Sequence, residues 1–150
     1  MHTSTRHTDV PDTGRRSPGA DRIGRTLMAL CAIATIGAFV DGISRVSGAP
    51  DDYVLTEFWR TTAYLVFAGM WALLAVAPRA QRGMFELILL QKTLVTVHAV
   101  IVMGLPGSAQ TAAIDGALVV ATVTAYVLCR GWYAWKRRPW SAGPDQDRSA

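Results

Sequence analysis

The chain has 150 residues, of which 51% are hydrophobic, and a formal net charge of +4. This length allows one domain, and the hydrophobic share lies above the usual range for soluble globular chains. The basic residues flank apolar segments instead of forming an aromatic-interleaved groove, and the sequence has no nucleic-acid motif, so binding to DNA or RNA is not favoured.

The N-terminal segment is polar. Residues 1–25, "MHTSTRHTDVPDTGRRSPGADRIGR", are rich in Thr, Ser, Pro, Gly, Asp and Arg and show no apolar periodicity. Such a composition is typical of disorder. We expect a disordered cytoplasmic tail.

The first apolar run covers residues 26–46, "TLMALCAIATIGAFVDGISRV". Its uninterrupted part, residues 27–40, is short enough to be the core of a signal peptide. The interval that follows holds Asp41 and Arg45 and is long for a cleavage region. These features favour a membrane helix over a cleaved signal.

Three further apolar runs cover residues 58–78, 84–105 and 111–132. Each has roughly 20 residues, which as a helix extend about 30 Å, the thickness of the hydrocarbon layer. The sequence therefore predicts an all-α integral membrane four-helix bundle over residues 26–133, followed by a basic cytoplasmic tail, residues 134–150.

The charges between the runs predict the orientation. The first connection, "SGAPDDYVLTE", is acidic and the third, "PGSAQ", is uncharged, whereas the "PRAQRG" turn and both tails are basic. By the positive-inside rule, both termini of this multi-pass protein are cytoplasmic, and we expect it in the cell inner (plasma) membrane. The segment "WYAWKRRPW", residues 132–140, is typical of an interfacial belt that binds anionic lipid.

Small residues at four-residue spacing indicate close helix contacts, because lipid provides no hydrophobic drive between helices. One such stripe lies in the first span and one in the fourth. They predict either a contact between these two spans or a homodimer interface, and they consist of Ala34, Ala38 and Gly42, and of Ala117, Ala121 and Ala125.

In this topology the outer half of the bundle holds Asp41, Arg45, Arg60, His98 and Asp115, and Lys92 lies below them near the midplane. A Lys at the bilayer centre costs roughly 2.5 to 3.5 kcal/mol unless it is paired or hydrated. We therefore expect Lys92 to have a carboxylate partner, either Asp41, Asp115 or Glu86, among which the sequence does not choose. The candidate ligand-binding cluster comprises Asp41, Arg60, Lys92, His98 and Asp115.

Helical spacing groups further polar residues with this cluster. Asp41 and Arg45 can pair along one face, Gln91 shares a face with His98, and Thr96 shares one with Lys92. Asp115, Thr122, Tyr126 and Cys129 form one stripe of the fourth span. The supporting residues are Arg45, Glu86, Gln91, Thr96, Thr122 and Tyr126.

Each of these features also has a structural interpretation. A buried ion pair of Lys92 can simply hold the helices in register, and the charges of Asp41, Arg45 and Arg60 can form interfacial ion pairs. His98 can be a hydrogen-bonded core residue or, beside Lys92, a proton shuttle.

Several catalytic and cofactor sites are not supported by the sequence. Only His98 lies in a span, so a haem held by two histidines is excluded, and Cys31 and Cys129 form no C-x-x-C motif. Ser44 has no hydrolase context, and neither a phosphate loop nor a metal-ligand motif is present. No catalytic residue, metal or cofactor is evident, which favours a protein that is not an enzyme.

The acidic first outer loop, the second span "FWRTTAYLVFAGMWALL" and the "PRAQRG" turn carry a family resemblance. With four short helices and cytoplasmic termini, residues 26–133 resemble the DoxX-like group of small bacterial membrane proteins, in which we include the BphX-like family. The resemblance implies a redox-associated accessory subunit, with a quinone as cofactor and a membrane enzyme as partner.

Three hypotheses about function remain open at this point. The first is an accessory subunit or small-ligand binder that uses the intramembrane polar cluster. The second is a small proton-coupled transporter that acts as a homodimer, and the third is a structural or lipid-organising membrane protein.

Overall fold

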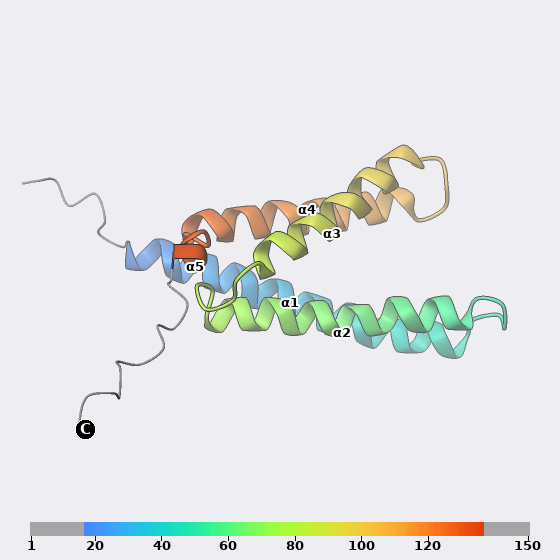
Figure 1. Cartoon of the computed structure of the whole chain (residues 1–150). Coiled ribbons are helices and arrows are strands. Elements are labelled where there is room, and N and C mark those ends of the chain that lie inside the picture. The colour runs from blue at the N-terminus through green and yellow to red at the C-terminus, as the bar shows by residue number, and fades with distance from the viewer. Residues whose placement is uncertain (1–16, 137–150) are drawn as a thin grey trace, which may run out of the picture.

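The computed structural model describes residues 17–136, which form helices without any strand in that range (Figure 1). The helices are α1 (Pro18–Ser47), α2 (Val54–Val76), α3 (Met84–Ile101), α4 (Ser108–Leu128) and the short α5 (Tyr133–Lys136). Helices α1 to α4 are long and apolar enough to cross a membrane. The predicted all-α class is confirmed, and four such helices indicate a multi-pass membrane protein.

Helix α1 begins at Pro18 and not at residue 26, as the apolar run suggested. Ser17 accepts a hydrogen bond from the backbone N–H of Ala20 (3.4 Å), and proline suits the first helical position because its missing N–H needs no partner there. Residues 18–25 of the predicted disordered tail are thus helical, while residues 1–16 lie outside the described residues. The 30 residues of α1 extend about 45 Å, more than a hydrocarbon layer needs.

The other helices also differ from the predicted spans at their ends. Helix α2 begins at residue 54 and not 58, α3 ends at 101 and not 105, and α4 covers 108–128 and not 111–132. Gly83 and Gly107 immediately precede α3 and α4 with φ of 76° and 80°, a left-handed conformation that favours glycine. Helix α5 lies at the start of the predicted basic tail, whose residues 137–150 are outside the described part.

The four long helices form two antiparallel hairpins, α1–α2 and α3–α4, and α1 also packs against α4. The hairpins lie together at one end and diverge toward the loops at 48–53 and 102–107 (Figure 1). We call these the converging end and the loop end. The apolar core, near the converging end, contains Met28, Trp71, Leu74, Phe85, Ile88 and Ala125.

Most other large apolar side chains lie on the outside of the helices. Ile33 is 68% exposed, Trp59 73% and Leu87 61%. An apolar surface of this extent suits lipid, in which side chains need not be covered and each backbone is satisfied within its own helix.

Two arginine side chains join the segments that meet at the converging end. Arg25 donates to the carbonyl oxygens of Ala75 and Val76 at 2.7 Å each, and so caps the C-terminus of α2. Arg79 pairs with Asp21 and donates to the carbonyl oxygen of Cys129 at 2.9 Å. The start of α1, the turn after α2 and the end of α4 are thereby fixed together.

The predicted contact between the first and fourth spans is confirmed, and Ala125 takes part in it, but Ala34, Gly42 and Ala117 do not. Gly42 packs against Thr61 of α2, since a Cβ there would lie 2.6 Å from the Thr61 hydroxyl oxygen. Ala34 and Ala117 are exposed. The close approach of α1 to α4 occurs at Gly24, where a Cβ would lie 3.3 Å from the carbonyl oxygen of Ala125.

Candidate functional site

Lys92 occupies the apolar core stripe of α3. The buried residues of this helix are Phe85, Ile88, Lys92 and Ala99, at the three-, four- and seven-residue spacings that define one helical face. Lys92 stands at the middle of α3 and is only 6% exposed. Its charge is therefore held where an apolar residue would ordinarily pack.

Asp115 of α4 is the partner of Lys92. The Lys92 ammonium donates to Oδ1 of Asp115 at 2.6 Å, and both residues are buried. Asp115 and Thr122 lie seven residues apart on one buried face of α4, and the buried Cys129 continues this spacing just beyond the helix. The prediction of a carboxylate partner is confirmed, and the structure selects Asp115 over Asp41 and Glu86.

Two aromatic rings from α2 complete the surroundings of Lys92. Its Nζ lies 4.7 Å from the ring centroid of Phe67 and 5.8 Å from that of Trp71, distances at which a ring face attracts a cation. The Trp71 indole N–H donates to the Thr122 hydroxyl oxygen at 3.3 Å and is held in place by it. We call Phe67, Trp71, Lys92, Asp115 and Thr122 the Lys92 site.

The Lys92 site retains unused hydrogen-bonding capacity. Among the described residues, Asp115 Oδ1 is the one acceptor bonded to the Lys92 ammonium, which has three donors, and Asp115 Oδ2 receives no hydrogen bond. The side chains of Lys92 and Asp115 keep 8% and 12% exposure. The pair therefore leaves two ammonium donors and one carboxylate oxygen without a hydrogen bond among the described residues.

The other predicted cluster residues do not join this site. Asp41 pairs with Arg45 at 2.7 Å and Arg60 with Glu57, in each case a neighbour one helical turn away. Between residues 17 and 136, no hydrogen bond or ion pair connects Asp41, Arg60 or His98 to Lys92 or Asp115. The expected convergence of all five charges is therefore not observed.

His98 is exposed on α3, and the interpretation of it as a hydrogen-bonded core residue is wrong. Ala99, its neighbour, takes the buried position of that turn and is 3% exposed. The face that His98 shares with Gln91 lies beside the core stripe of α3.

Three of the supporting residues have different roles. Glu86 accepts hydrogen bonds from the Tyr126 hydroxyl (3.1 Å) and the Trp135 indole N–H (3.0 Å), which ties α5 to α3 and α4. Thr96 donates to the backbone carbonyl of Lys92 within α3. Gln91 holds its Oε1 buried, and no donor reaches it from the part of the chain that the structure describes.

Sequence reasoning missed the aromatic residues of the Lys92 site. Phe67 and Trp71 are apolar residues in an apolar span, so neither is conspicuous alone. Their four-residue spacing places both on one face of α2, and their ring centroids lie 5.9 Å apart. That spacing, together with a lysine inside an apolar span that needs stabilising neighbours, is the signal that could have indicated them.

The described residues contain no group of three or more His, Cys, Asp or Glu side chains that could hold a metal ion. Comparison of the chain with known protein families, curated proteins and solved structures gave no match.

Proposed function

We propose that this protein is a membrane-embedded binder of a small lipid-soluble ligand, held at the Lys92 site, and that it performs no catalysis itself. The observation that supports this proposal is the Lys92–Asp115 ion pair. Lys92 lies at the middle of the apolar helix α3, and both side chains have hydrogen-bonding groups without a partner among the described residues. A buried ion pair favours stability only weakly compared with apolar packing. Ionisable groups inside membrane spans mark functional sites by default.

The ligand chemistry follows from the groups that face it. The spare N–H groups of Lys92 suit a carbonyl oxygen, the free oxygen of Asp115 suits a hydroxyl donor, and Phe67 and Trp71 suit a flat ring. A quinone or its quinol combines these features. It is also the cofactor that the DoxX-like resemblance implies, so we propose an accessory quinone-binding subunit of a membrane oxidoreductase.

The proposed location is the plasma membrane, with both termini in the cytoplasm. The contacts of Arg79 with Asp21 and Cys129 support this orientation, because they bring the start of α1 and the end of α4 to one end of the bundle. That end carries Arg22, Arg25, Arg79 and Arg82, as the positive-inside rule requires of a cytoplasmic end.

Binding of a short-chain benzoquinone to the detergent-solubilised protein tests the function. Trp71 is part of the site, so we expect saturable quenching of tryptophan fluorescence, lost in Lys92→Met/Asp115→Leu. Thr124→Val is the matched control, because it removes an exposed hydroxyl of α4 that bonds only within its own helix. Equal quenching of the parent and the double variant would refute the assignment.

The structural alternative makes a different prediction for the same double variant. If the pair serves only to hold the helices in register, no quinone binds the parent protein. The double variant then folds, and its fluorescence response to quinone is the same as that of the parent. Unsaturable quenching in the parent, with a folded double variant, would therefore support the structural role.

A further inference from the structure

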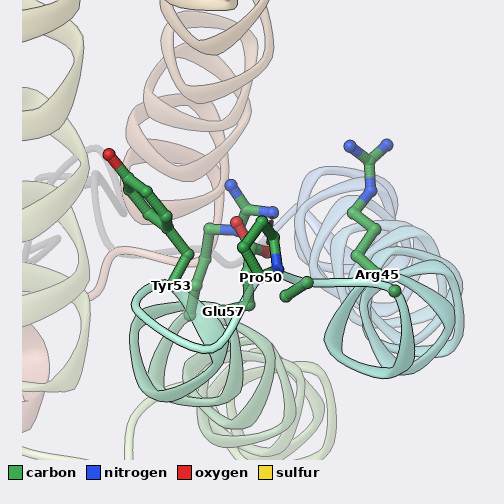
Figure 2. Close-up of a pocket in the computed structure, with 7 residues that line it drawn as sticks. Arg45, Pro50, Tyr53 and Glu57 are labelled. Atoms are coloured by element: carbon green, nitrogen blue, oxygen red, sulfur yellow. Dashed lines mark hydrogen bonds and ion pairs between the residues drawn. The ribbon is translucent and has the colours of Figure 1, made fainter.

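A second polar site lies at the loop end, where α1 passes into α2. A hollow of about 500 Å³ is lined there by Arg45, Gly48, Ala49, Pro50, Tyr53, Glu57 and Arg60. Figure 2 shows Arg45 rising from α1, and Tyr53 and Glu57 from the beginning of α2, with their side chains directed to the same side of the two helices. None of these residues belongs to the Lys92 site.

The two guanidinium groups have donors to spare. Arg45 uses Nε on Asp41, and Arg60 uses Nη2 on Glu57. Neither side chain makes another hydrogen bond within residues 17–136, and the Tyr53 hydroxyl makes none there. Arginine presents five N–H donors in a planar fork, which fits a phosphate with two parallel hydrogen bonds.

The charge balance of the hollow excludes a ligand that is only an anion. Arg45 and Arg60 are offset by Asp41 and Glu57, and Asp51 and Asp52 lie in the same loop. The surroundings are therefore net acidic, and an added negative charge would be repelled. A ligand that brings a phosphate and its own cation avoids that repulsion, because the cation can contact Glu57.

The surroundings of the hollow indicate a lipid. Tyr53, which lines the hollow, is 59% exposed, and at the same depth Leu55 and Trp59 are exposed on the side of α2 away from Glu57. Exposed Trp and Tyr at the end of a membrane span are typical of the headgroup interface. The Cα–Cβ bond of Arg60 tilts toward the N-terminus of α2, and so toward this interface.

We propose that the hollow binds the headgroup of a zwitterionic phospholipid with a primary amine, of the phosphatidylethanolamine type. The phosphodiester accepts hydrogen bonds from Arg45 and Arg60, and the ammonium donates to Glu57. The acyl chains extend from the hollow toward the bilayer centre, beside the α1–α2 hairpin.

Thermal melting of the protein in delipidated detergent micelles tests the proposal. We expect phosphatidylethanolamine to raise Tm by about 4 °C or more, as a ligand that binds only the folded state does. Phosphatidylcholine should act more weakly because its quaternary ammonium cannot donate a hydrogen bond, and anionic phosphatidylglycerol should be the weakest. An equal or larger effect of phosphatidylglycerol would overturn the zwitterion assignment.

Soluble glycerophosphoethanolamine separates the lipid from its free headgroup. No shift with this compound, beside a shift with phosphatidylethanolamine, supports a lipid site, whereas equal shifts would overturn it in favour of a soluble ligand. In Arg45→Gln/Arg60→Gln we expect the shift to vanish. The control Arg22→Gln, which removes an exposed arginine at the converging end, should keep it.

A persistent shift in the double variant would place the lipid elsewhere and overturn the proposal. If that variant does not fold, retention of lipid by the parent in native mass spectrometry decides instead. Preferential retention of phosphatidylethanolamine over phosphatidylglycerol supports the site, and the reverse preference overturns it.

Discussion

Lys92, without a partner at the middle of an apolar helix, would cost roughly 2.5 to 3.5 kcal/mol. Asp115, 2.6 Å away, and the ring faces of Phe67 and Trp71 offset that cost by stabilising the protonated amine. Each of these groups comes from a helix other than α3. Helices α2 and α4 thus both supply groups to this one charge, which supports the proposal that Lys92 has a function.

Removal of the lysine charge alone should be strongly destabilising. In Lys92→Met the Asp115 carboxylate stays buried without its partner, and we expect a loss of about 3–5 kcal/mol in unfolding free energy. The measurement is thermal or denaturant unfolding in detergent. In Lys92→Met/Asp115→Leu we expect most of that loss to be recovered, since apolar residues of similar volume can replace a buried pair. Additive losses in the double variant would contradict the coupling.

Cys129, just beyond α4, should be an unreactive thiol. Burial raises its pKa, the Asp21 carboxylate adds to this, and Arg79 and Arg25 oppose it. Because folding favours the neutral thiol, Cys129 contributes to the stability of the folded protein at pH values below the ordinary thiol pKa of about 8.5. This contribution is lost as the pH rises through the higher pKa that the thiol has in the folded protein.

Labelling with N-ethylmaleimide, located by peptide mass spectrometry, checks the reactivity of Cys129. At pH 7 we expect labelling on the order of tenfold slower in the folded protein than after unfolding in dodecyl sulfate. Equal rates would mean that the end of α4 opens readily. The buried Cys31 should be similarly protected.

At the scale of the helices, the bundle depends on how closely α1 approaches its two neighbours. Gly24 lets α1 meet α4, and Gly42 lets it meet α2. Without a hydrophobic drive between helices in lipid, such close packing supplies much of the association energy. Gly37, in the same helix, faces open space and has no packing role.

Substitution of Gly24 and of Gly37 by alanine should change the stability of the protein in opposite directions. In Gly24→Ala the added Cβ lies 2.5 Å from Cys129 Sγ, and we expect a loss of about 1–3 kcal/mol. In Gly37→Ala nothing lies within 4 Å, so the better helix propensity should stabilise by about 0.5–1 kcal/mol. Melting temperatures of the two variants decide, and a gain in both would mean that α1 and α4 are not tightly packed at Gly24.

At the scale of the whole molecule, two hairpins meet firmly at one end and diverge toward the other (Figure 1). The converging end contains the apolar core and the arginine contacts of Arg25 and Arg79. The Lys92 site joins α2 to the α3–α4 hairpin, although α2 and α3 otherwise contact little. A ligand at this site would therefore influence how the hairpins sit against each other.

The proposed orientation predicts the behaviour of reporter fusions in bacterial cells. Green fluorescent protein fused after residue 150 should fluoresce, because the C-terminus is expected in the cytoplasm. Alkaline phosphatase fused after residue 50 should be active, and the same enzyme fused after residue 150 inactive. Active phosphatase at the C-terminus would reverse the topology and place the hollow at residues 45–60 on the cytoplasmic side.

The sequence alone determined the helical class, the number of long apolar helices and the presence of a lysine that needs a carboxylate. Hydropathy over about 20 residues reports these properties because each depends on local composition. Hydropathy did not locate the helix ends. At the start of α1, for example, the Ser17 cap and Pro18 extend the helix beyond its apolar part.

Only the tertiary structure decided which charges meet. Asp41, Glu86 and Asp115 all carry a carboxylate, and the choice of Asp115 depends on the rotation and depth of α4 against α3. The aromatic rings at Lys92 and the hollow beside Arg45 likewise require helices that are distant in sequence, or a turn that brings two helix ends together. Side-chain contacts between helices depend on angles and offsets that a one-dimensional pattern does not contain.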